Sequence, residues 1–263
     1  LDLSPTGKRA LVTARGEVFT VPVEDGSTRN VTSTGDRREY SALWSPDGGE
    51  LAWIVDSREG QTLVIANQDG RGERREYPLG PSFYDLRSWS GGDTPRIAYT
   101  DNHLSLYVIE TDGGRITTID TGVRRESVEL AFSPAGDWLA YTHEQANYNR
   151  DLVLHDLAAG KRHVITDGAA DVAAPAFSPD GKYLYFAAST NAGPIQVGLN
   201  MTSQERPYRA GLYAVVLAAD GESPLLPDGG DEEAAGGDDK GDKEKKGGKG
   251  KKDRKDNGDD EEK

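Results

Sequence analysis

The sequence predicts an all-β protein with a β-propeller fold, and three observations lead to that prediction. A Ser-Pro-Asp-Gly element recurs along the chain, short apolar runs flank its copies, and no segment carries a 3.6-residue apolar period over three turns. The serines of the repeat stand at positions 4, 45, 90, 133 and 178, so successive copies are 41, 45, 43 and 45 residues apart. This spacing is typical of propeller blades with four strands each.

The repeated element has the composition of a hairpin turn. Proline presets φ at the first turn position, and Asp-Gly closes the turn. The repeat therefore indicates that its serine is a turn residue and not a nucleophile. Four copies are clear and the fifth is degraded: Leu3-Ser4-Pro5-Thr6-Gly7, Trp44-Ser45-Pro46-Asp47-Gly48, Phe132-Ser133-Pro134-Ala135-Gly136, Phe177-Ser178-Pro179-Asp180-Gly181 and, degraded, Trp89-Ser90-Gly91-Gly92-Asp93.

Each unit contains expected strands in a fixed order, beginning with a run that leads into the Ser-Pro turn, as at residues 128–132. The strands expected directly after the turns are residues 10–12, 51–54, 97–99, 139–141 and 184–186. The next strands are residues 18–21, 63–65, 106–109, 152–154 and 212–216. A Gly-containing turn follows each of these, and a last strand leads out, as at residues 162–166.

The number of units predicts a partial ring. We expect four full blades, preceded by the later strands of another, because nothing precedes Leu1 to provide the inner strand of that unit. Propellers remove their edges by circular closure, and an uncovered blade face of ~400 Å² would cost on the order of 10 kcal/mol. We therefore expect the sequence to be a segment of a longer polypeptide. The alternative, a small five-bladed ring whose termini pair, would need a donor strand that the sequence does not reveal.

The composition divides the chain at residue 227. Residues 1–227 are expected to form the propeller blades, and residues 228–263 are Gly, Asp, Glu and Lys with almost no apolar residue. Such a segment buries too little apolar area to offset the entropy of ordering. We expect a disordered, flexible linker; an interaction tail is the alternative.

Composition also argues against several classes of function. The chain has no cysteine, which excludes disulfides, thiol catalysis and Cys-ligated metals. Its 45 acidic and 31 basic residues give a formal net charge of −14, which argues against binding to a nucleic-acid backbone. No apolar run approaches the roughly 18–20 residues that span a bilayer. We expect neither a nucleic-acid nor a membrane partner.

The sequence provides no catalytic residue, metal site or cofactor motif that we can assign. It lacks a Gly-x-Ser-x-Gly elbow, a phosphate-binding loop and a His-Glu-x-x-His motif, the nearest approach being His143-Glu144-Gln145-Ala146-Asn147. His103, His143, His155 and His163 are scattered over successive units. We interpret each as an ordinary surface or turn histidine.

Several runs resemble the second propeller of the tricorn proteases and their bacterial homologues. The most specific are Arg-Gly-Glu-Val-Phe-Thr-Val-Pro at residues 15–22 and Ser-Thr-Asn-Ala-Gly-Pro at residues 189–194. Residues 29–32, 101–107 and 206–217 agree with the same family. The resemblance covers essentially residues 1–227, and the remaining tail matches in composition alone.

The resemblance implies a function for a larger parent chain. Tricorn-like enzymes are cytoplasmic serine peptidases that degrade oligopeptides, with two propellers followed by a small mixed domain, a PDZ domain and a catalytic domain. The nucleophilic Ser, its His and the supporting acid would lie after residue 263, so no catalytic residue transfers to this chain. The implied partners are peptide substrates, the other domains of the parent chain and further copies in a homo-oligomer. The alternative is a free-standing TolB-like propeller that mediates protein–protein interaction; an enzyme with its own site in these residues is a third.

The inner strands predict a channel, because the first strand of each blade lines the central tunnel of a propeller. Polar residues before the Ser-Pro turns would form its rim or wall, and arginine could pair with a peptide carboxylate. Solvated loop charge is the alternative for each residue. The candidates are Arg37, Arg38, Glu39, Asp85, Arg87, Arg124, Arg125, Glu126 and Asp171.

Overall fold

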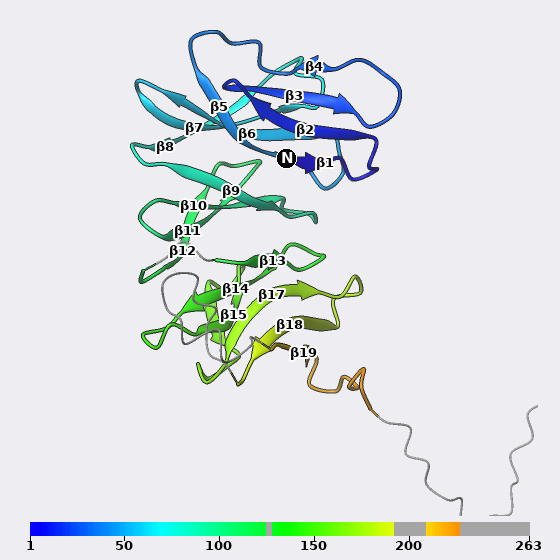
Figure 1. Cartoon of the computed structure of the whole chain (residues 1–263), viewed down its shortest axis with the longest axis vertical. Coiled ribbons are helices and arrows are strands. Elements are labelled where there is room, and N and C mark those ends of the chain that lie inside the picture. Colours follow the sequence, from blue (N-terminus) through cyan, green and yellow to red (C-terminus); the bar gives the residue numbers. More distant parts are fainter. Residues whose placement is uncertain (125–127, 192–208, 227–263) are drawn as a thin grey trace, which may run out of the picture. The chain divides into compact units, whose positions relative to one another are not determined.

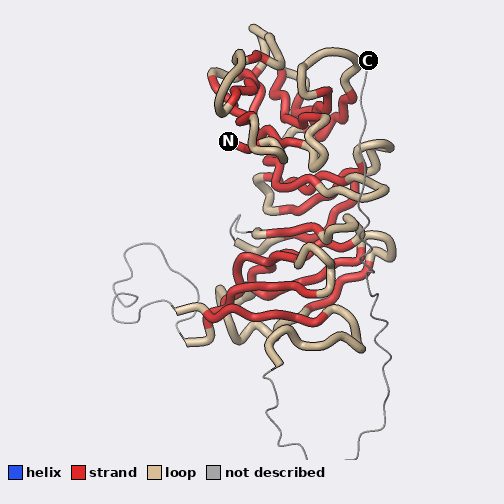
Figure 2. The backbone as a smooth tube through the Cα atoms, turned by 90° about the vertical axis from the view of Figure 1, so that its right-hand side faces the viewer, coloured by secondary structure: helices blue, strands red, loops and turns tan. Residues whose placement is uncertain are grey.

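A computed structural model describes residues 1–124, 128–191 and 209–226. All regular elements in these residues are strands, and they form five antiparallel sheets (Figures 1 and 2). The first sheet comprises β1 (Asp2–Leu3), β2 (Arg9–Ala14), β3 (Glu17–Pro22) and β4 (Arg29–Asn30). The second comprises β5 (Arg38–Trp44), β6 (Glu50–Ser57), β7 (Gly60–Asn67) and β8 (Arg75–Gly80).

The remaining three sheets follow in chain order. The third comprises β9 (Tyr84–Trp89), β10 (Arg96–Asp101), β11 (Ser105–Glu110) and β12 (Ile116–Thr121). The fourth comprises β13 (Leu130–Phe132), β14 (Trp138–Glu144), β15 (Arg150–Asp156) and β16 (Lys161–Val164). The fifth comprises β17 (Asp171–Phe177), β18 (Tyr183–Ser189) and β19 (Gly211–Val216). The prediction of an all-β propeller with blades of four antiparallel strands is confirmed.

The first sheet corrects one expectation. Its inner strand is present as β1, in which Asp2 pairs with Leu11 and Leu3 with Ala10. The Asp2 carboxylate also accepts the Trp44 N–H at 3.0 Å, so β1 bonds to the next sheet. A two-residue strand is too short to show alternation, which is why the sequence did not reveal it. Within the described part of the chain, the sheet with fewer than four strands is the fifth.

Buried serines explain why the Ser-Pro turn recurs. Ser45 Oγ accepts the Glu50 N–H across the hairpin at 2.9 Å and donates to Asp47 Oδ1 at 2.6 Å. The Gly48 N–H donates to the Ser45 carbonyl, and Gly48 has a φ of +76°, which glycine adopts without strain. The same serine-to-backbone bond occurs at Ser4, Ser90, Ser133 and Ser178. The prediction that these serines are turn residues is confirmed.

Apolar side chains between successive sheets form the core. Four clusters of buried residues lie at the four contacts between sheets that follow one another in the chain. The middle strands have neighbours on both faces, so five consecutive residues of β6, 51–55, are buried. The inner strands β5, β9, β13 and β17 contact one another in chain order, which places the strands that lead into successive Ser-Pro turns side by side.

Candidate functional site

An open cavity of about 430 Å³ lies against the inner strands of the third, fourth and fifth sheets. Its wall combines three charged side chains, Asp85, Arg87 and Glu129, with apolar ones. The remaining lining residues are Leu86, Val128, Leu130, Ala174 and Pro175. None of these described lining residues has a hydroxyl, thiol, imidazole or amine side chain. The charged and apolar groups of the wall therefore suit contact with a polar chain.

Irregularities in the inner strands shape this wall. The pairing of β9 with β10, and that of β17 with β18, shifts register at Arg87 and at Ala174–Pro175 respectively. β5 has the same irregularity at Ser41, and Ser41 and Ala174 both have a φ of +51°. A bulge leaves a backbone group without its partner in the ladder. In this protein a side chain from the preceding sheet supplies that partner.

Two bonds of this kind stand at corresponding positions, four residues before the serine of the turn. Ser41 Oγ accepts the Leu86 N–H at 2.7 Å, and Glu129 Oε2 accepts the Ala174 N–H at 2.6 Å. Leu86 occupies the same position in the third sheet, but its side chain has no acceptor atom. There the link to the fourth sheet comes from Arg87, whose Nη2 donates to the Val128 carbonyl at 2.9 Å. The wall is therefore tied from sheet to sheet by hydrogen bonds.

Asp85 and Arg87 form the polar side of the cavity on β9. Arg87 Nη1 lies 3.2 Å from Asp85 Oδ2, and Ser41 Oγ donates to Asp85 Oδ1 at 2.5 Å. The Asp85 side chain is 50% exposed and that of Arg87 29%. The Asp85 carboxylate is therefore held in position and still accessible to solvent.

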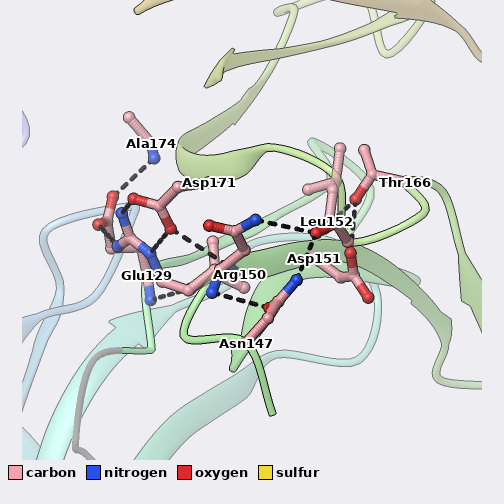
Figure 3. A network of polar contacts seen from close by, with 11 residues as sticks. Glu129, Asn147, Arg150, Asp151, Leu152, Thr166, Asp171 and Ala174 are labelled. Carbon is pink, nitrogen blue, oxygen red and sulfur yellow. Dashed lines mark hydrogen bonds and ion pairs between the residues drawn. The ribbon is translucent and has the colours of Figure 1, made fainter. Parts of the chain in front are cut away.

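An arginine in the fourth sheet organises the opposite side. Arg150 donates through Nε and Nη2 to the two carboxylate oxygens of Asp171, at 2.9 and 3.0 Å, and through Nη1 to Glu129 Oε1 at 2.6 Å. Figure 3 shows Arg150 between the two carboxylates, with the Ala174 N–H directed at Glu129. The hydrogen bonds to Asp171 raise the pKa of Arg150, against burial, which lowers it, and Glu129 adds to the increase. Arg150 thus joins β15, β17 and the segment before β13.

The structure brings some of the predicted channel residues together and not others. Asp85 and Arg87 line the cavity. Asp171 lies behind its wall, only 1% exposed and bound by Arg150. Arg124 stacks over the Tyr148 ring at 4.3 Å and donates to the Ala146 carbonyl at 3.2 Å. Arg125 and Glu126 lie outside the described residues.

The group predicted on the second sheet lies elsewhere. Arg37 contacts Asp36 at 3.8 Å and lines a different hollow of about 580 Å³, together with Arg58 and Glu59. Arg38 lies over the Tyr40 ring at 5.2 Å. Glu39 is 2% exposed and accepts a hydrogen bond from Thr34 Oγ1. Contact of any predicted residue with a peptide stays a prediction.

Sequence reasoning missed Glu129 and Arg150. Glu129 stands in an apolar run, and Arg150 is 21 residues from each of its two carboxylate partners. A useful signal was available for Glu129: aligned on the Ser-Pro turns, it occupies the position of Ser41, where a side chain faces the next sheet. Two histidines also differ from expectation, because His155 is only 7% exposed and the largely buried His143 contacts Asp120.

We searched the described residues for metal-binding groups and for membrane-spanning helices. Within the described ranges, no group of three His, Cys, Asp or Glu side chains is arranged to hold a metal ion. The same residues contain no helix of the length and apolarity needed to cross a membrane.

Known proteins similar to this chain include several tricorn proteases. The chain is 26% identical over 231 residues to tricorn protease homolog 1 of Streptomyces coelicolor, covering 84% of this chain and 21% of that protein. It is 25% identical over 209 residues to the tricorn protease homolog of Saccharolobus solfataricus, covering 77% and 18%. The chain thus spans about a fifth of the length of these relatives.

Solved structures give the same fold. A crystal structure of the tricorn protease matches with a TM-score of 0.64 and 20% identity, over 87% of this chain and 22% of that one. A putative TolB from Agrobacterium tumefaciens matches with a TM-score of 0.52 and 20% identity, over 71% and 68%. At this level of identity, both likenesses establish the fold alone.

The family model described as the tricorn protease second beta propeller domain matches residues 1–259. The match continues past residue 227, where the composition predicts that the blades end, and that boundary stays a prediction. Because the match includes every strand of the five sheets, this chain belongs to the family of the tricorn protease second beta propeller domain.

Proposed function

We propose that this chain is a substrate gate and scaffold within a larger tricorn-like serine peptidase that degrades oligopeptides. The observation that carries the proposal is the cavity of about 430 Å³ along the inner strands of three successive sheets, with Asp85, Arg87 and Glu129 in its wall. An extended peptide presents amide groups and charged side chains that such a wall can contact. The described lining residues include no Ser or His, and the proposal places the Ser, His and acid of the reaction downstream in the parent chain.

The proposal includes the setting of the parent enzyme. Its partners would be peptide substrates, the other propeller, and the PDZ and catalytic domains, in a homo-oligomer in the cytoplasm. Family membership supports a larger peptidase, and the wall supports contact with a peptide. The role as a gate is the step that needs an experiment.

The test compares long and short peptides in the peptidase that contains this segment. Asp85→Arg places a large cation at the cavity wall, and should change the hydrolysis rate of long peptides several-fold while leaving very short peptides unaffected. Glu73→Arg makes the same charge change at an exposed residue outside the cavity lining, and should alter neither rate. An unchanged ratio of long to short rates in a folded Asp85→Arg enzyme would count against the gate.

A free-standing TolB-like role makes a different prediction. A chain of this kind would act without any attached peptidase, and Asp85→Arg would then alter binding to a protein partner only. The likeness to TolB concerns the fold and does not favour this alternative.

A further inference from the structure

A histidine–carboxylate pair lies between the third and fourth sheets. Asp120 stands near the end of β12 and His143 near the end of β14, and His143 Nδ1 lies 2.7 Å from Asp120 Oδ2. The two side chains are 17% and 18% exposed, so the pair is largely shielded from solvent. Arg162 Nη2 lies 3.8 Å from the same carboxylate oxygen.

The pair borders an otherwise apolar contact. Ala98, Leu106 and Ile119 of the third sheet pack there against Leu139 and Val153 of the fourth. A pair at low dielectric interacts more strongly than an exposed one, and a change in its charge has a larger effect. The ionisable groups around the imidazole are Asp120 on β12, Tyr141 and Glu144 on β14, Asp151 and His155 on β15, and Arg162 and His163 on β16.

The pair also lies directly behind the wall of the cavity. Val128 lines both the cavity and the small hollow that contains Asp120 and His143. Thr142, which precedes His143, donates its N–H to the Glu129 carbonyl at 2.9 Å, and its Oγ1 accepts the Glu129 N–H at 3.0 Å. Opening of the contact at His143 would therefore loosen the segment that carries Glu129.

Both side chains of the pair belong to titratable residue types. Burial raises the pKa of Asp120, but His143, Tyr141 and the Thr121 backbone together lower it by more, so the pKa lies below its ordinary value. A carboxyl with a lowered pKa in the folded state stabilises the fold above its unfolded pKa, and this stabilisation is lost as pH falls through the folded value. At the other end, imidazoles lose their charge between about pH 5 and 8. Above that range the 2.7 Å contact is without the attraction of opposite charges.

We propose that the Asp120–His143 pair is a pH-sensitive contact between the third and fourth sheets, firmly closed at mildly acidic pH and weaker above neutral pH. The contact sets how rigidly the segment that carries Val128 and Glu129 is held. This inference does not depend on the proposed peptide gate, because it concerns the opening of two sheets of this chain.

Hydrogen exchange of the full chain tests the proposal. Exchange is followed by mass spectrometry at pH 5.5 and 8.0, with rates corrected for the intrinsic effect of pH. We expect peptides from β12 and β14 to open roughly fivefold more often at pH 8.0, the ratio expected for an ion pair of about 1 kcal/mol. Peptides from β6 and β7, which lie in the second sheet, should show no such ratio and serve as an internal reference.

Two substitutions identify the pair as the cause. His143→Gln should remove the difference between the two pH values, and so should Asp120→Asn, which keeps the size of the side chain and a hydrogen-bond acceptor. His103→Gln, at an exposed histidine in the turn after β10, should leave the difference intact. Equal opening of the wild-type chain at both pH values, or an undiminished ratio in the folded variants, would overturn the proposal. If His143→Gln does not fold, the ratio of opening at the two pH values in Asp120→Asn tests the proposal by itself.

Discussion

The contact between the second and third sheets differs in kind from the two contacts of the fourth sheet. Ile54, Leu63, Ile97 and Ile109 fill the former together with a group of tyrosines, in which the rings of Tyr99 and its neighbours lie 5.2–5.8 Å apart. The fourth sheet also has apolar contacts, but largely buried ion pairs border them, whereas the pair Arg75–Asp112 between the second and third sheets is more exposed. Asp120 of the third sheet pairs with His143 of the fourth, and Arg150 of the fourth sheet pairs with Asp171 of the fifth.

This difference shows where charge can control the structure. Apolar packing scales with buried area and does not change with protonation. A buried ion pair is sensitive to the loss of either partner, because the remaining charge is left without compensation. Both ion pairs lie next to the cavity, whereas the apolar contact between the second and third sheets reaches it through Leu86 alone and brings no charged group of its cluster to it. We therefore expect pH and single charge changes to act on the fourth sheet first.

Removal of Arg150 should have the largest effect of the changes considered. Arg150→Met leaves the Asp171 carboxylate, 1% exposed, without its partner, and frees Glu129 Oε1. We expect the free energy of unfolding in urea, followed by tryptophan fluorescence, to fall by about 3–5 kcal/mol.

A double variant provides the control for this prediction. Arg150→Met with Asp171→Leu removes both charges, and should recover a large part of the lost stability, since an apolar pair of similar volume often replaces a buried ion pair without loss. A loss below about 1 kcal/mol in Arg150→Met alone would show that solvent already screens the pair.

A cavity in the apolar contact should cost somewhat less and should not respond to pH. Ile97 is fully buried between the second and third sheets, and Ile97→Ala should lower the free energy of unfolding by about 2–5 kcal/mol. The same loss at pH 5.5 and pH 8.0 is expected, because no titratable group changes. A loss that varied with pH would contradict the contrast between the two kinds of contact.

The sequence was a good guide to the hairpins and a poor one to the contacts between sheets. Ser45, Pro46 and Gly48 act within one turn, so their spacing alone predicts the structure around them. β1 escaped prediction because two residues carry no period. Fold class therefore followed from local chemistry, which the repeat displays several times.

The candidate site depends on pairs that are distant in sequence. Asp85 and Arg87 were predicted because they precede a turn serine, and they do line the cavity. The burial of Glu39 could not be predicted, because it depends on Thr34 and on how the segment before β5 folds back. Nothing in the residues around Arg150 indicated that it would meet Asp171, since that contact exists only once β15 packs on β17.

Substitution of the turn serines should lower the free energy of unfolding equally in the second and fourth sheets. Ser45 in the second sheet and Ser133 in the fourth make the same bond to the backbone across the hairpin, at 2.9 and 3.0 Å. Ser45→Ala and Ser133→Ala each leave a backbone N–H without its acceptor, and should each cost about 1–3 kcal/mol in urea unfolding. Equal losses of stability would show that the hairpins of the two sheets are alike, and that the sheets differ in their contacts with neighbouring sheets. A much larger loss for Ser133→Ala would contradict this.

The smallest expected effect concerns a second histidine of the fourth sheet. His155 is 7% exposed, and its Nδ1 has no hydrogen-bond partner among the described residues. Burial lowers the pKa of His155 below its ordinary value of 6.5, against the neighbouring charges of Asp156 and Asp120, which raise it. In the pH range just below 6.5 the unfolded chain therefore binds more protons at this residue than the folded chain does.

The sign of the effect follows from this difference in protonation. Stability from His155 is fully present above pH 6.5 and declines as pH falls below it, which is opposite to the pH dependence expected of the Asp120–His143 pair. His155→Gln should therefore flatten the loss of stability on acidification from pH 7 to pH 5, and His143→Gln should steepen it, both measured by urea unfolding at several pH values. Ile97→Ala should leave the slope as it is in the wild-type chain. A change of the slope in the same direction by His155→Gln and His143→Gln would contradict the opposite pH dependences expected of His155 and of the Asp120–His143 pair.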